Sequence, residues 1–374
     1  MPRQAVGAVV AGPDATPHVQ PIVLDPPGPG EVLVRMVASG VCHSDAWATR
    51  YGNWGDPFPM LLGHEGAGVI EEVGPQAAPV VRAHEPGDAV LLAWAVPCGV
   101  CRGCRRGLPR TCDHGWRQPP RIHTVVGEPL IGTLSLGTLA SHTVVNAAQA
   151  LALPPDADLA QVCLLGCGAS TGVGAALNTG GVRPGDAVCV IGLGGIGLAA
   201  LQGARIGGAT RLIAVDLVPE KLELARSFGA TDVVNASSGD PVAAVRALTG
   251  GDGVDLALEA TGMPSVVPQA VAMLARGGTA VAIGVPPPDS SVTIRWSGAD
   301  GAAYPTKSTL RITDGGDPLP EDFARWIGWA VEGRLDLGGM VTRELSLTDD
   351  DLAEAFRAML AGEVIRSVVR MDPG

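Results

Sequence analysis

The sequence predicts an α/β protein with two domains, a mostly antiparallel β domain and a doubly wound parallel sheet. At 374 residues the chain is long enough for two substantial cores. Glycine and proline turns separate short β-like segments up to about residue 165. From about residue 185, short apolar strands alternate with helical patterns, which is typical of a parallel sheet covered on both faces.

Each part has its own set of expected elements. In the first part the β-like segments are 31–41, 66–74, 88–96 and 141–145. In the second part we expect strands at 186–192, 211–216, 232–236, 253–261 and 278–285, with helices at 195–208, 218–230, 240–250 and 266–278. The tail has two helical patterns, 321–334 and 349–363, and a strand at 365–371. We expect the tail to return to the first domain.

Charge and composition exclude several classes of protein. The net charge of −12 and the pI near 5.0 argue against a nucleic-acid or anionic-membrane partner. No apolar run reaches 18 residues, and the N-terminus lacks the pattern of a secretory signal. We therefore expect a cytoplasmic protein, in which the eight cysteines are ligands or buried thiols rather than disulfides.

Four cysteines stand close together in the spacing C-x2-C-x2-C-x7-C: Cys98, Cys101, Cys104 and Cys112. A disulfide knot, an iron–sulfur nest and a zinc site are the alternatives, and a reducing compartment favours a metal. Zinc suits four thiolates, which complete a tetrahedron and leave no position for water or substrate. The sequence thus predicts a structural zinc that stabilises a loop without a core of its own.

A glycine-rich motif marks a nucleotide site. Gly192, Gly194 and Gly197 form G-x-G-x-x-G directly after a strand and at the start of a helix, where the backbone can approach a pyrophosphate. The next strand ends at Asp216, an acidic residue suited to the ribose hydroxyls of NAD and unfavourable for the 2′-phosphate of NADP. Asp216 could instead cap the helix that follows. The motif also includes Leu193, Gly195 and Ile196.

Further metal-capable side chains are scattered among glycine turns. They are Cys42 in "SGVCHSDAW", His64 and Glu65 in "LLGHEGAGVIEEVG", and Cys167 in "LLGCGAST". These are ligand types that zinc accepts. Nothing in their spacing shows that they converge.

The motifs together carry a family resemblance. "GVCHSD", "GHEGAGVIEEVG", the four-cysteine lobe, "LLGCGASTGVGAALN", "GLGGIG" and "VIRSVV" occur in the same order as in zinc-containing alcohol dehydrogenases of the medium-chain dehydrogenase/reductase superfamily. The resemblance implies a GroES-like catalytic domain from residues 1–168 and 306–374, with the zinc lobe at about 95–115. It implies a Rossmann NAD-binding domain at 169–305, with the active site in the cleft between the domains.

The same resemblance implies roles for the scattered residues. Cys42, His64 and Cys167 would hold a catalytic zinc, with Glu65 as an occasional ligand and Asp45 orienting the imidazole of His64. The chain would therefore bind two zinc ions, one catalytic and one structural. A zinc-activated alkoxide would then pass its hydride to NAD.

Proton transfer is where the chain departs from the best-known animal enzymes. Ser44 resembles the hydroxyl that starts the family's proton relay, but Trp47 stands where the terminal histidine is expected. Because indole cannot shuttle a proton, the proton must leave through the ribose to another base or to water. His43 resembles a residue that contacts the pyrophosphate, and it could alternatively be that base.

Other positions match residues around the cofactor and the substrate. Lys221 resembles a ribose contact, Arg366 a pyrophosphate contact and Thr171 a neighbour of the nicotinamide. Trp94, and with it Trp47, resembles an aromatic wall of the substrate pocket.

Two substrates remain open. A tryptophan-lined pocket favours an aromatic, terpenoid-like or other apolar primary or secondary alcohol, or the matching aldehyde or ketone. The segments "RRGLPRTC", "GAALNTGGV" and "VIRSVV" resemble the actinobacterial branch that contains mycothiol-dependent formaldehyde dehydrogenase. A thiol adduct would need a cationic surface, and Arg105, Arg106 and Arg110 are candidates.

Two other classes fit the sequence less well. A zinc-free quinone or enoyl reductase should lack Cys42, Cys167 and the lobe, and a non-catalytic zinc or NAD sensor should have lost Ser44 or a ligand. The family resemblance implies a homodimer joined through the NAD domains, with 291–296 ("SVTIRW") as a candidate edge strand, and a tetramer as the alternative.

Overall fold

The structure is a computed structural model that describes residues 1–52, 58–75, 84–112, 119–294 and 307–371. The chain forms two compact units. The first unit comprises Met1–Cys167, Leu319–Gly333 and Leu337–Gly374, and the second comprises Gly168–Pro318 and Arg334–Asp336.

The first unit contains a closed five-stranded barrel in the order β1-β2-β7-β8-β4. Its pairs are antiparallel except for β4 and β8, which run parallel. Apolar side chains such as Ile22, Leu24 and Leu61 fill a buried cluster in this part of the unit. The barrel strands are β1 (Arg3–Val10), β2 (His18–Leu24), β4 (Met60–Leu61), β7 (Ile122–Thr124) and β8 (Pro129–Gly132).

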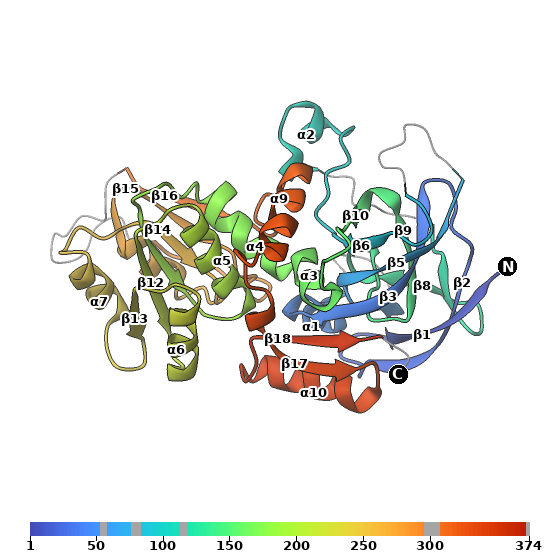
Figure 1. Ribbon diagram of the computed structural model, residues 1–374. Helices are drawn as coiled ribbons and strands as arrows, with labels where there is room; N and C mark the ends of the chain where they lie inside the picture. The colour runs from blue at the N-terminus through green and yellow to red at the C-terminus, as the bar shows by residue number, and fades with distance from the viewer. Residues whose placement is uncertain (53–57, 76–83, 113–118, 295–306, 372–374) are drawn as a thin grey trace. The chain divides into compact units, whose positions relative to one another are not determined.

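A second sheet of the first unit is organised around one long strand, β3 (Glu31–Val41). Beside β3 lie β5 and β9 from the first part of the chain and β18 from its end, all antiparallel to it (Figure 1). The tail therefore returns to this sheet, with β17 paired parallel to β18. The remaining strands are β5 (Glu65–Val73), β6 (Ala89–Leu92), β9 (His142–Asn146), β10 (Ala150–Ala152), β17 (Val341–Ser346) and β18 (Arg366–Arg370).

The helices of the first unit are short or amphipathic. α10 (Asp349–Leu360) packs on β17 and β18, and its N-terminus is capped by the hydroxyl of Thr348. The other helices are α1 (His43–Tyr51), α2 (Arg102–Arg105), α3 (Leu159–Val162) and α9 (Pro320–Val331).

The second unit is a six-stranded parallel sheet in the order β13-β12-β11-β14-β15-β16. Because the chain starts in the middle and reverses its direction of growth between β11 and β14, this is the doubly wound fold that the sequence predicts. The strands are β11 (Ala187–Ile191), β12 (Arg211–Asp216), β13 (Asp232–Asn235), β14 (Val254–Glu259), β15 (Leu274–Ala282) and β16 (Thr309–Ile312). The helices are α4 (Gly168–Gly174), α5 (Gly195–Ile206), α6 (Pro219–Ser227), α7 (Pro241–Leu248) and α8 (Val267–Ala272).

Several predicted boundaries differ from the structure, and two of the differences affect the parallel sheet. The helix expected at 266–278 ends at Ala272, because the backbone from Leu274 onward pairs with β14. The first domain resumes at Leu319 rather than at residue 306, because β16 adds to the parallel sheet of the second unit. The expected edge strand fails in a related way: 291–294 form no strand, 295 and 296 lie outside the described residues, and β16 is the edge.

No single helix in the described parts of the chain is long and apolar enough to span a membrane. One pair of helices with a bend between them, Leu159–Gly166 and Gly168–Thr179, has the length and composition of a membrane span only when the two helices are counted together.

Candidate metal centres and dinucleotide site

The scattered metal-capable residues converge in the first unit. The ligand atoms of Cys42, His64, Glu65 and Cys167 all lie within 4.8 Å of one another, and all four side chains are buried. The register of two strands accounts for part of this, because Gly40 of β3 pairs with Glu65 of β5. A Cβ at Gly40 would lie 2.2 Å from a carboxylate oxygen of Glu65, so glycine at this position leaves room for that carboxylate.

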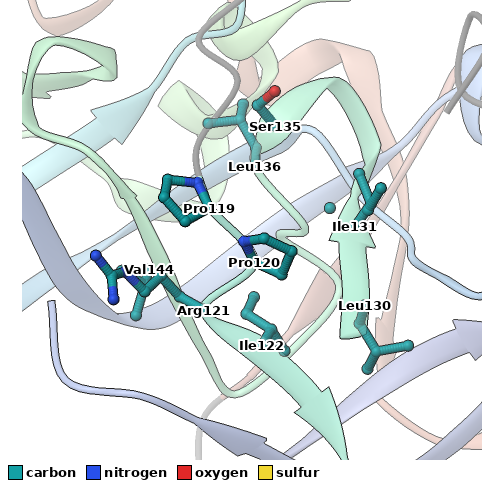
Figure 2. Close-up of a pocket in the computed structure, with 10 residues that line it drawn as sticks. Pro119, Pro120, Arg121, Ile122, Leu130, Ile131, Ser135, Leu136 and Val144 are labelled. Carbon is teal, nitrogen blue, oxygen red and sulfur yellow. The ribbon is translucent and has the colours of Figure 1, made fainter. Parts of the chain in front are cut away.

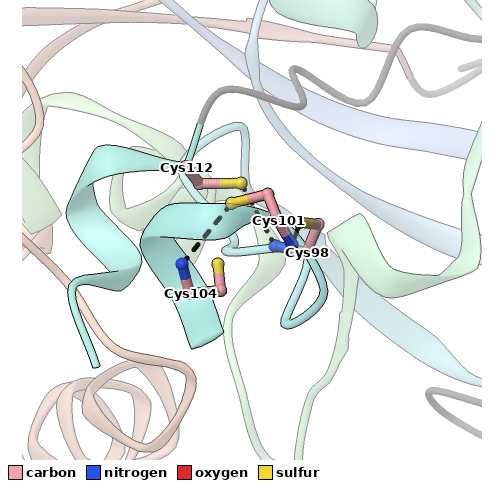
Figure 3. Close-up of side chains that lie close together, drawn as sticks. All are labelled: Cys98, Cys101, Cys104 and Cys112. Carbon is pink, nitrogen blue, oxygen red and sulfur yellow. Dashed lines mark hydrogen bonds between the residues drawn. The ribbon is translucent and has the colours of Figure 1, made fainter. Parts of the chain in front are cut away.

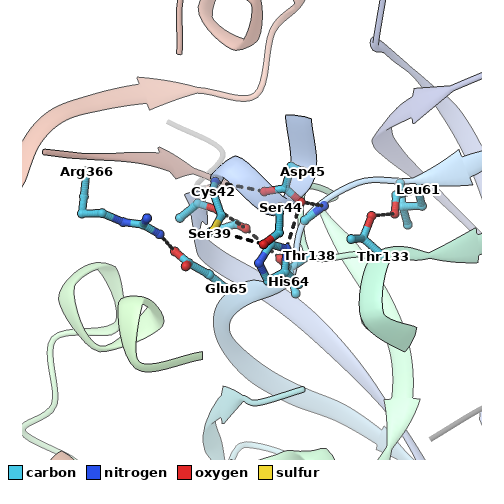
Figure 4. A network of polar contacts seen from close by, with 12 residues as sticks. Ser39, Cys42, Ser44, Asp45, Leu61, His64, Glu65, Thr133, Thr138 and Arg366 are labelled. Carbon is cyan, nitrogen blue, oxygen red and sulfur yellow. Dashed lines mark hydrogen bonds and ion pairs between the residues drawn. The ribbon is translucent and has the colours of Figure 1, made fainter. Parts of the chain in front are cut away.

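Asp45 connects Cys42 and His64 by hydrogen bonds (Figure 4). One carboxylate oxygen accepts the backbone N–H of Cys42 at 3.0 Å. The other accepts the N–H of Gly63 and Nδ1 of His64, each at 3.0 Å. Since a carboxylate can only accept, Nδ1 of His64 carries the proton and Nε2 presents its lone pair.

The surroundings of Nε2 of His64 test whether a metal ion fits this site. Nε2 of His64 is buried and has no hydrogen-bond partner among the described residues. A buried polar atom without a partner is costly, whereas a lone pair facing two cysteine sulfurs is the arrangement that zinc requires. The residues present therefore fit a zinc ion.

Zinc and protons compete for this cluster, because the pKa of His64 and that of Cys167 lie above their usual values while that of Cys42 lies below. A hydrogen bond from Cys167 holds the pKa of the Cys42 thiol well below its usual value, although burial opposes this. The bond to Cys42, together with burial, raises the pKa of Cys167. Burial alone would lower the pKa of His64, but Asp45 and Cys42 raise it well above its usual value. The cluster thus favours a thiolate at Cys42, the form in which cysteine binds zinc.

Glu65 lies at the edge of this cluster and forms a buried ion pair with Arg366 of β18. Arg366 is 5% exposed, and its Nε has no partner among the described residues. The structure therefore places Arg366, which the resemblance assigns to the cofactor pyrophosphate, directly beside the metal-capable carboxylate. A charge buried to this extent needs its partner.

Three of the relay and pocket residues lie on α1, and the fourth, Trp94, follows β6. Ser44 is half-buried, with its Oγ 3.8 Å from the sulfur of Cys42. His43 is exposed at the first position of the helix. Trp47 is half-buried with its ring centroid 4.6 Å from that of Tyr51, and Trp94 packs against the buried core.

The four-cysteine lobe forms the second cluster (Figure 3). The sulfurs of Cys98, Cys101, Cys104 and Cys112 lie within 4.8 Å of one another, and none is in a disulfide. Three backbone N–H groups donate to sulfurs at 3.4 Å, those of Cys98, Cys101 and Cys104. Four convergent sulfurs with N–H donors match a closed tetrahedral zinc site.

The glycine-rich loop of the second unit has the shape that a pyrophosphate site needs. Gly192 has φ +89°, and a Cβ there would lie 2.7 Å from Cγ2 of Thr261. A Cβ at Gly197 would lie 1.8 Å from the carbonyl of Gly192, so α5 can approach the strand only with glycine there. A Cβ at Gly194 would meet nothing within 4 Å, so the loop is open at that point. The start of α5 therefore fits the pyrophosphate of NAD.

Asp216 fixes this loop to the end of β12. Its carboxylate accepts the N–H of Leu193 at 2.7 Å and the N–H of Val218 at 3.0 Å. Val218, not Asp216, is the N-cap of α6, so the alternative role as helix cap is wrong. Lys221 lies half-buried on α6, and Thr171 is buried in α4.

Comparison with known proteins identifies the family. Residues 28–155 match the family model "Alcohol dehydrogenase GroES-like domain", and residues 195–323 match "Zinc-binding dehydrogenase". The S-(hydroxymethyl)glutathione dehydrogenase of Escherichia coli O1:K1 is 37% identical over 382 residues, covering 97% of this chain and 98% of that protein. The chain belongs to the zinc-containing alcohol dehydrogenases of the medium-chain dehydrogenase/reductase superfamily.

Solved structures of similar dehydrogenases agree with this. An alcohol dehydrogenase zinc-binding domain protein from Burkholderia ambifaria superposes with a TM-score of 0.89 at 32% identity, covering 100% of both chains. Benzyl alcohol dehydrogenase from Acinetobacter calcoaceticus gives 0.87 at 28% identity, covering 99% of this chain and 100% of that one. This dehydrogenase is an oxidoreductase of the alcohol:NAD class, with zinc and NAD as its cofactors.

A separate pocket in the dehydrogenase opens beside β7 and β8 (Figure 2). Its lining includes Arg121, which forms an ion pair of 2.7 Å with the buried Glu31. None of its lining residues belongs to either cysteine cluster. We therefore assign it no part in the chemistry of the zinc site.

Gly63 of this alcohol dehydrogenase also supports the site, and the sequence did not predict this role. Its N–H donates to Asp45, its φ is +94°, and a Cβ there would lie 2.2 Å from the backbone nitrogen of Leu139. A glycine directly before a ligand histidine was the available signal. Only the fold shows that its N–H points to the carboxylate.

Proposed function

We propose that the chain oxidises an apolar primary or secondary alcohol with NAD, and reduces the matching carbonyl compound, at the cluster of Cys42, His64 and Cys167. The observation that carries this proposal is the buried Nε2 of His64, which has no partner among the described residues and lies with two cysteine sulfurs. A zinc ion bound there would act as a Lewis acid on the substrate oxygen.

The protein's own groups prepare the site for this chemistry. Asp45 keeps Nδ1 of His64 protonated, so that Nε2 faces the cluster. Ser44, 3.8 Å from the sulfur of Cys42, is placed to take the proton that the alcohol loses. Arg366 neutralises Glu65, which stays beside the cluster as an additional ligand.

The proton leaves Ser44 by a route other than residue 47. Trp47 carries no group that can accept a proton, and its ring contacts Tyr51. His43 lies one position from Ser44 and is exposed, so it can exchange a proton with water. We assign the exit of the proton to the cofactor ribose followed by water, with contact to the pyrophosphate as the main role of His43.

The cofactor assignments belong to the same proposal. The loop from Gly192 to Gly197 would bind the pyrophosphate, and Asp216 would exclude the 2′-phosphate of NADP. Lys221 would contact the adenosine ribose and Thr171 would lie beside the nicotinamide. The family resemblance gives Arg366 a contact with the pyrophosphate; in this structure its guanidinium is buried beside Glu65.

The substrate proposal rests on Trp47 and Trp94, half-buried indoles that would form an apolar pocket wall. The similarity to a benzyl alcohol dehydrogenase favours such a substrate. The second candidate is a thiol adduct of formaldehyde, which the similarity to S-(hydroxymethyl)glutathione dehydrogenases favours. Exposed Arg105 and Arg106 on the lobe would be its cationic surface; the side chain of Arg110 lies outside the described structure.

A substrate panel with and without low-molecular-weight thiols separates the two candidates. We expect NAD reduction with benzylic or terpenoid alcohols at rates that added thiol does not change. Oxidation of formaldehyde only in the presence of mycothiol or glutathione, with no turnover of bulky alcohols, would overturn the proposed substrate. It would establish the thiol-adduct reaction instead.

We propose a homodimer through the exposed edge of β16, where Leu310 and Ile312 are 38% and 82% exposed. Ile312→Lys should then shift the mass measured by light scattering from dimer to monomer, and an unchanged mass would remove β16 from the interface. We place the enzyme in the cytoplasm, because none of the eight cysteines forms a disulfide, and reduced cysteines persist in a reducing compartment.

A further inference from the structure

Glu259 occupies a special place in the second unit. It is the last residue of β14, and it pairs with Ile191 of β11 on one side and Ala282 of β15 on the other. The order of the sheet reverses between β11 and β14. In doubly wound sheets the crevice at the carboxyl ends of those two strands is where ligands bind.

The carboxylate of Glu259 is buried in an unusual way. It is 1% exposed, and no cation pairs with it among the described residues, in contrast to Glu65. One oxygen, Oε1, accepts the N–H of Thr261 at 2.6 Å, the N–H of Gly262 at 3.2 Å and the hydroxyl of Thr261. The other, Oε2, has no partner within the described residues. Burial raises the pKa of Glu259 despite these donors.

The turn that Glu259 holds lies directly against the glycine-rich loop. Cγ2 of Thr261 is the nearest atom to the place where a Cβ of Gly192 would be, at 2.7 Å. The carbonyl of Gly192 in turn lies against Gly197, at the start of α5. On the other side, a Cβ at Gly284 would lie 2.0 Å from the nitrogen of Gly262, which prevents the turn from moving away.

These contacts form a chain from the carboxylate to the phosphate site. Because Thr261 lies close against Gly192, and Gly192 against the start of α5, a shift of Thr261 would displace Gly192 and the first N–H groups of α5. We propose that Glu259 is a positioning residue for the dinucleotide: it fixes the 261–262 turn under the glycine-rich loop and so sets the loop for the pyrophosphate and nicotinamide half of NAD. This inference rests on the dinucleotide site of the proposed function and adds a residue that acts through the turn.

The test compares binding of NAD with binding of AMP, measured by titration calorimetry on the zinc-loaded enzyme. AMP probes the adenosine side at Asp216 and lacks the pyrophosphate and nicotinamide. Glu259→Ala should weaken NAD about tenfold and change AMP less than twofold, because hydrogen bonds to a charged acceptor are the strong ones. Glu259→Gln keeps an acceptor oxygen and should restore most of the affinity for NAD.

Two substitutions at Thr261 test its two contacts separately. Thr261→Val removes the hydroxyl that donates to Glu259 and keeps a methyl group against Gly192, whereas Thr261→Ser does the reverse. Both should weaken NAD selectively. Asp255→Asn is the matched control. Asp255 is an exposed carboxylate on the same strand that accepts only the N–H of Ala187 among the described residues, so this variant should bind both ligands as wild type does.

Several results would overturn the inference. Equal loss of NAD and AMP binding in Glu259→Ala, with a lowered melting temperature, would make Glu259 merely structural. Unchanged NAD affinity in Glu259→Ala and both Thr261 variants would show that the turn has no effect on the loop. If Glu259→Ala does not fold, Glu259→Gln and the Thr261 pair give the same comparison. If the wild type binds neither AMP nor NAD, the dinucleotide site of the proposed function fails instead.

Discussion

The two cysteine clusters both offer ligands that zinc accepts, but they are built in different ways. The lobe draws its four ligands from a single short segment, Cys98–Cys112, and N–H groups of that segment support the sulfurs. The other cluster collects Cys42, His64 and Cys167 from distant parts of the chain, and every ligand is buried. A closed site can be encoded locally, whereas a site that must stay open to substrate depends on the tertiary fold.

The contacts that support the two clusters also differ, since those of the open cluster join distant segments of the chain. The open cluster is held by Asp45, which joins Cys42, Gly63 and His64, and by the ion pair of Glu65 with Arg366. These contacts unite β3, α1, β5 and β18, so the site exists only when the first unit is complete. The comparison therefore predicts that loss of the lobe zinc affects stability and that loss of the other zinc affects turnover.

The largest effect on turnover is expected from Cys167→Ser. The substitution keeps the shape of the side chain but removes a thiolate ligand, so turnover should fall about 10³-fold or more, with little change in melting temperature. Steady-state kinetics with NAD and a benzylic alcohol would measure this. The control is Cys163→Ser, a buried cysteine outside the cluster whose thiol donates to the carbonyl of Ala160. If both variants lose turnover equally, Cys167 has no special role.

Ser44→Ala should have the next largest effect. Loss of the proton acceptor should lower turnover about 10²-fold or more, while zinc content and the affinity for NAD stay at their wild-type values. Stopped-flow kinetics would measure the rate of hydride transfer, and metal analysis would show that the zinc content is unchanged. Wild-type rates of hydride transfer in this variant would remove Ser44 from the proton path.

Asp45→Asn should weaken only the open cluster. An amide group can accept with one oxygen, so at least one of the three donors to Asp45 loses its partner. Affinity for the catalytic zinc should fall about 10–100-fold, as is typical for such supporting carboxylates. Competition with a chelator should then remove one zinc much earlier than in wild type. Simultaneous release of both ions would contradict the separation of the two sites.

The smallest effect on turnover is expected from Cys104→Ser. This variant loses a ligand of the lobe zinc, and structural zinc sites contribute folding energy directly. The melting temperature should fall clearly, while turnover per folded molecule stays within about threefold of wild type because the closed site does no chemistry. A well-folded Cys104→Ser enzyme with no activity would contradict this.

Local patterns predicted much of the fold. The strand expected at 211–216 matches β12 at both ends, and 31–41 matches β3, because apolar runs between turn residues leave little choice. The end of α8 was missed, since the buried Met273 and Leu274 fit a helix or a strand and only pairing with β14 decides. The place of β16 in the parallel sheet likewise depends on a partner strand far away in sequence.

The candidate sites, like the fold, could be predicted from local sequence patterns only in part. Spacing alone predicts the lobe, and the glycine motif predicts the loop before α5. The convergence of Cys42, His64 and Cys167 was predicted only through the family resemblance, because these residues lie too far apart in the sequence for a local pattern to link them. The pairing of Arg366 with Glu65 and the turn held by Glu259 could not be predicted, since both depend on which buried charges the fold brings together.

The most direct test of the account is the zinc content of four proteins, measured by plasma mass spectrometry beside their turnover. Wild type should contain two zinc ions per chain, Cys167→Ser and Cys104→Ser one each, and the double variant none. Of the two single variants, only Cys104→Ser should remain active. Two zinc ions in Cys167→Ser, or an inactive but folded Cys104→Ser with one, would contradict the division into an open catalytic site and a closed structural one.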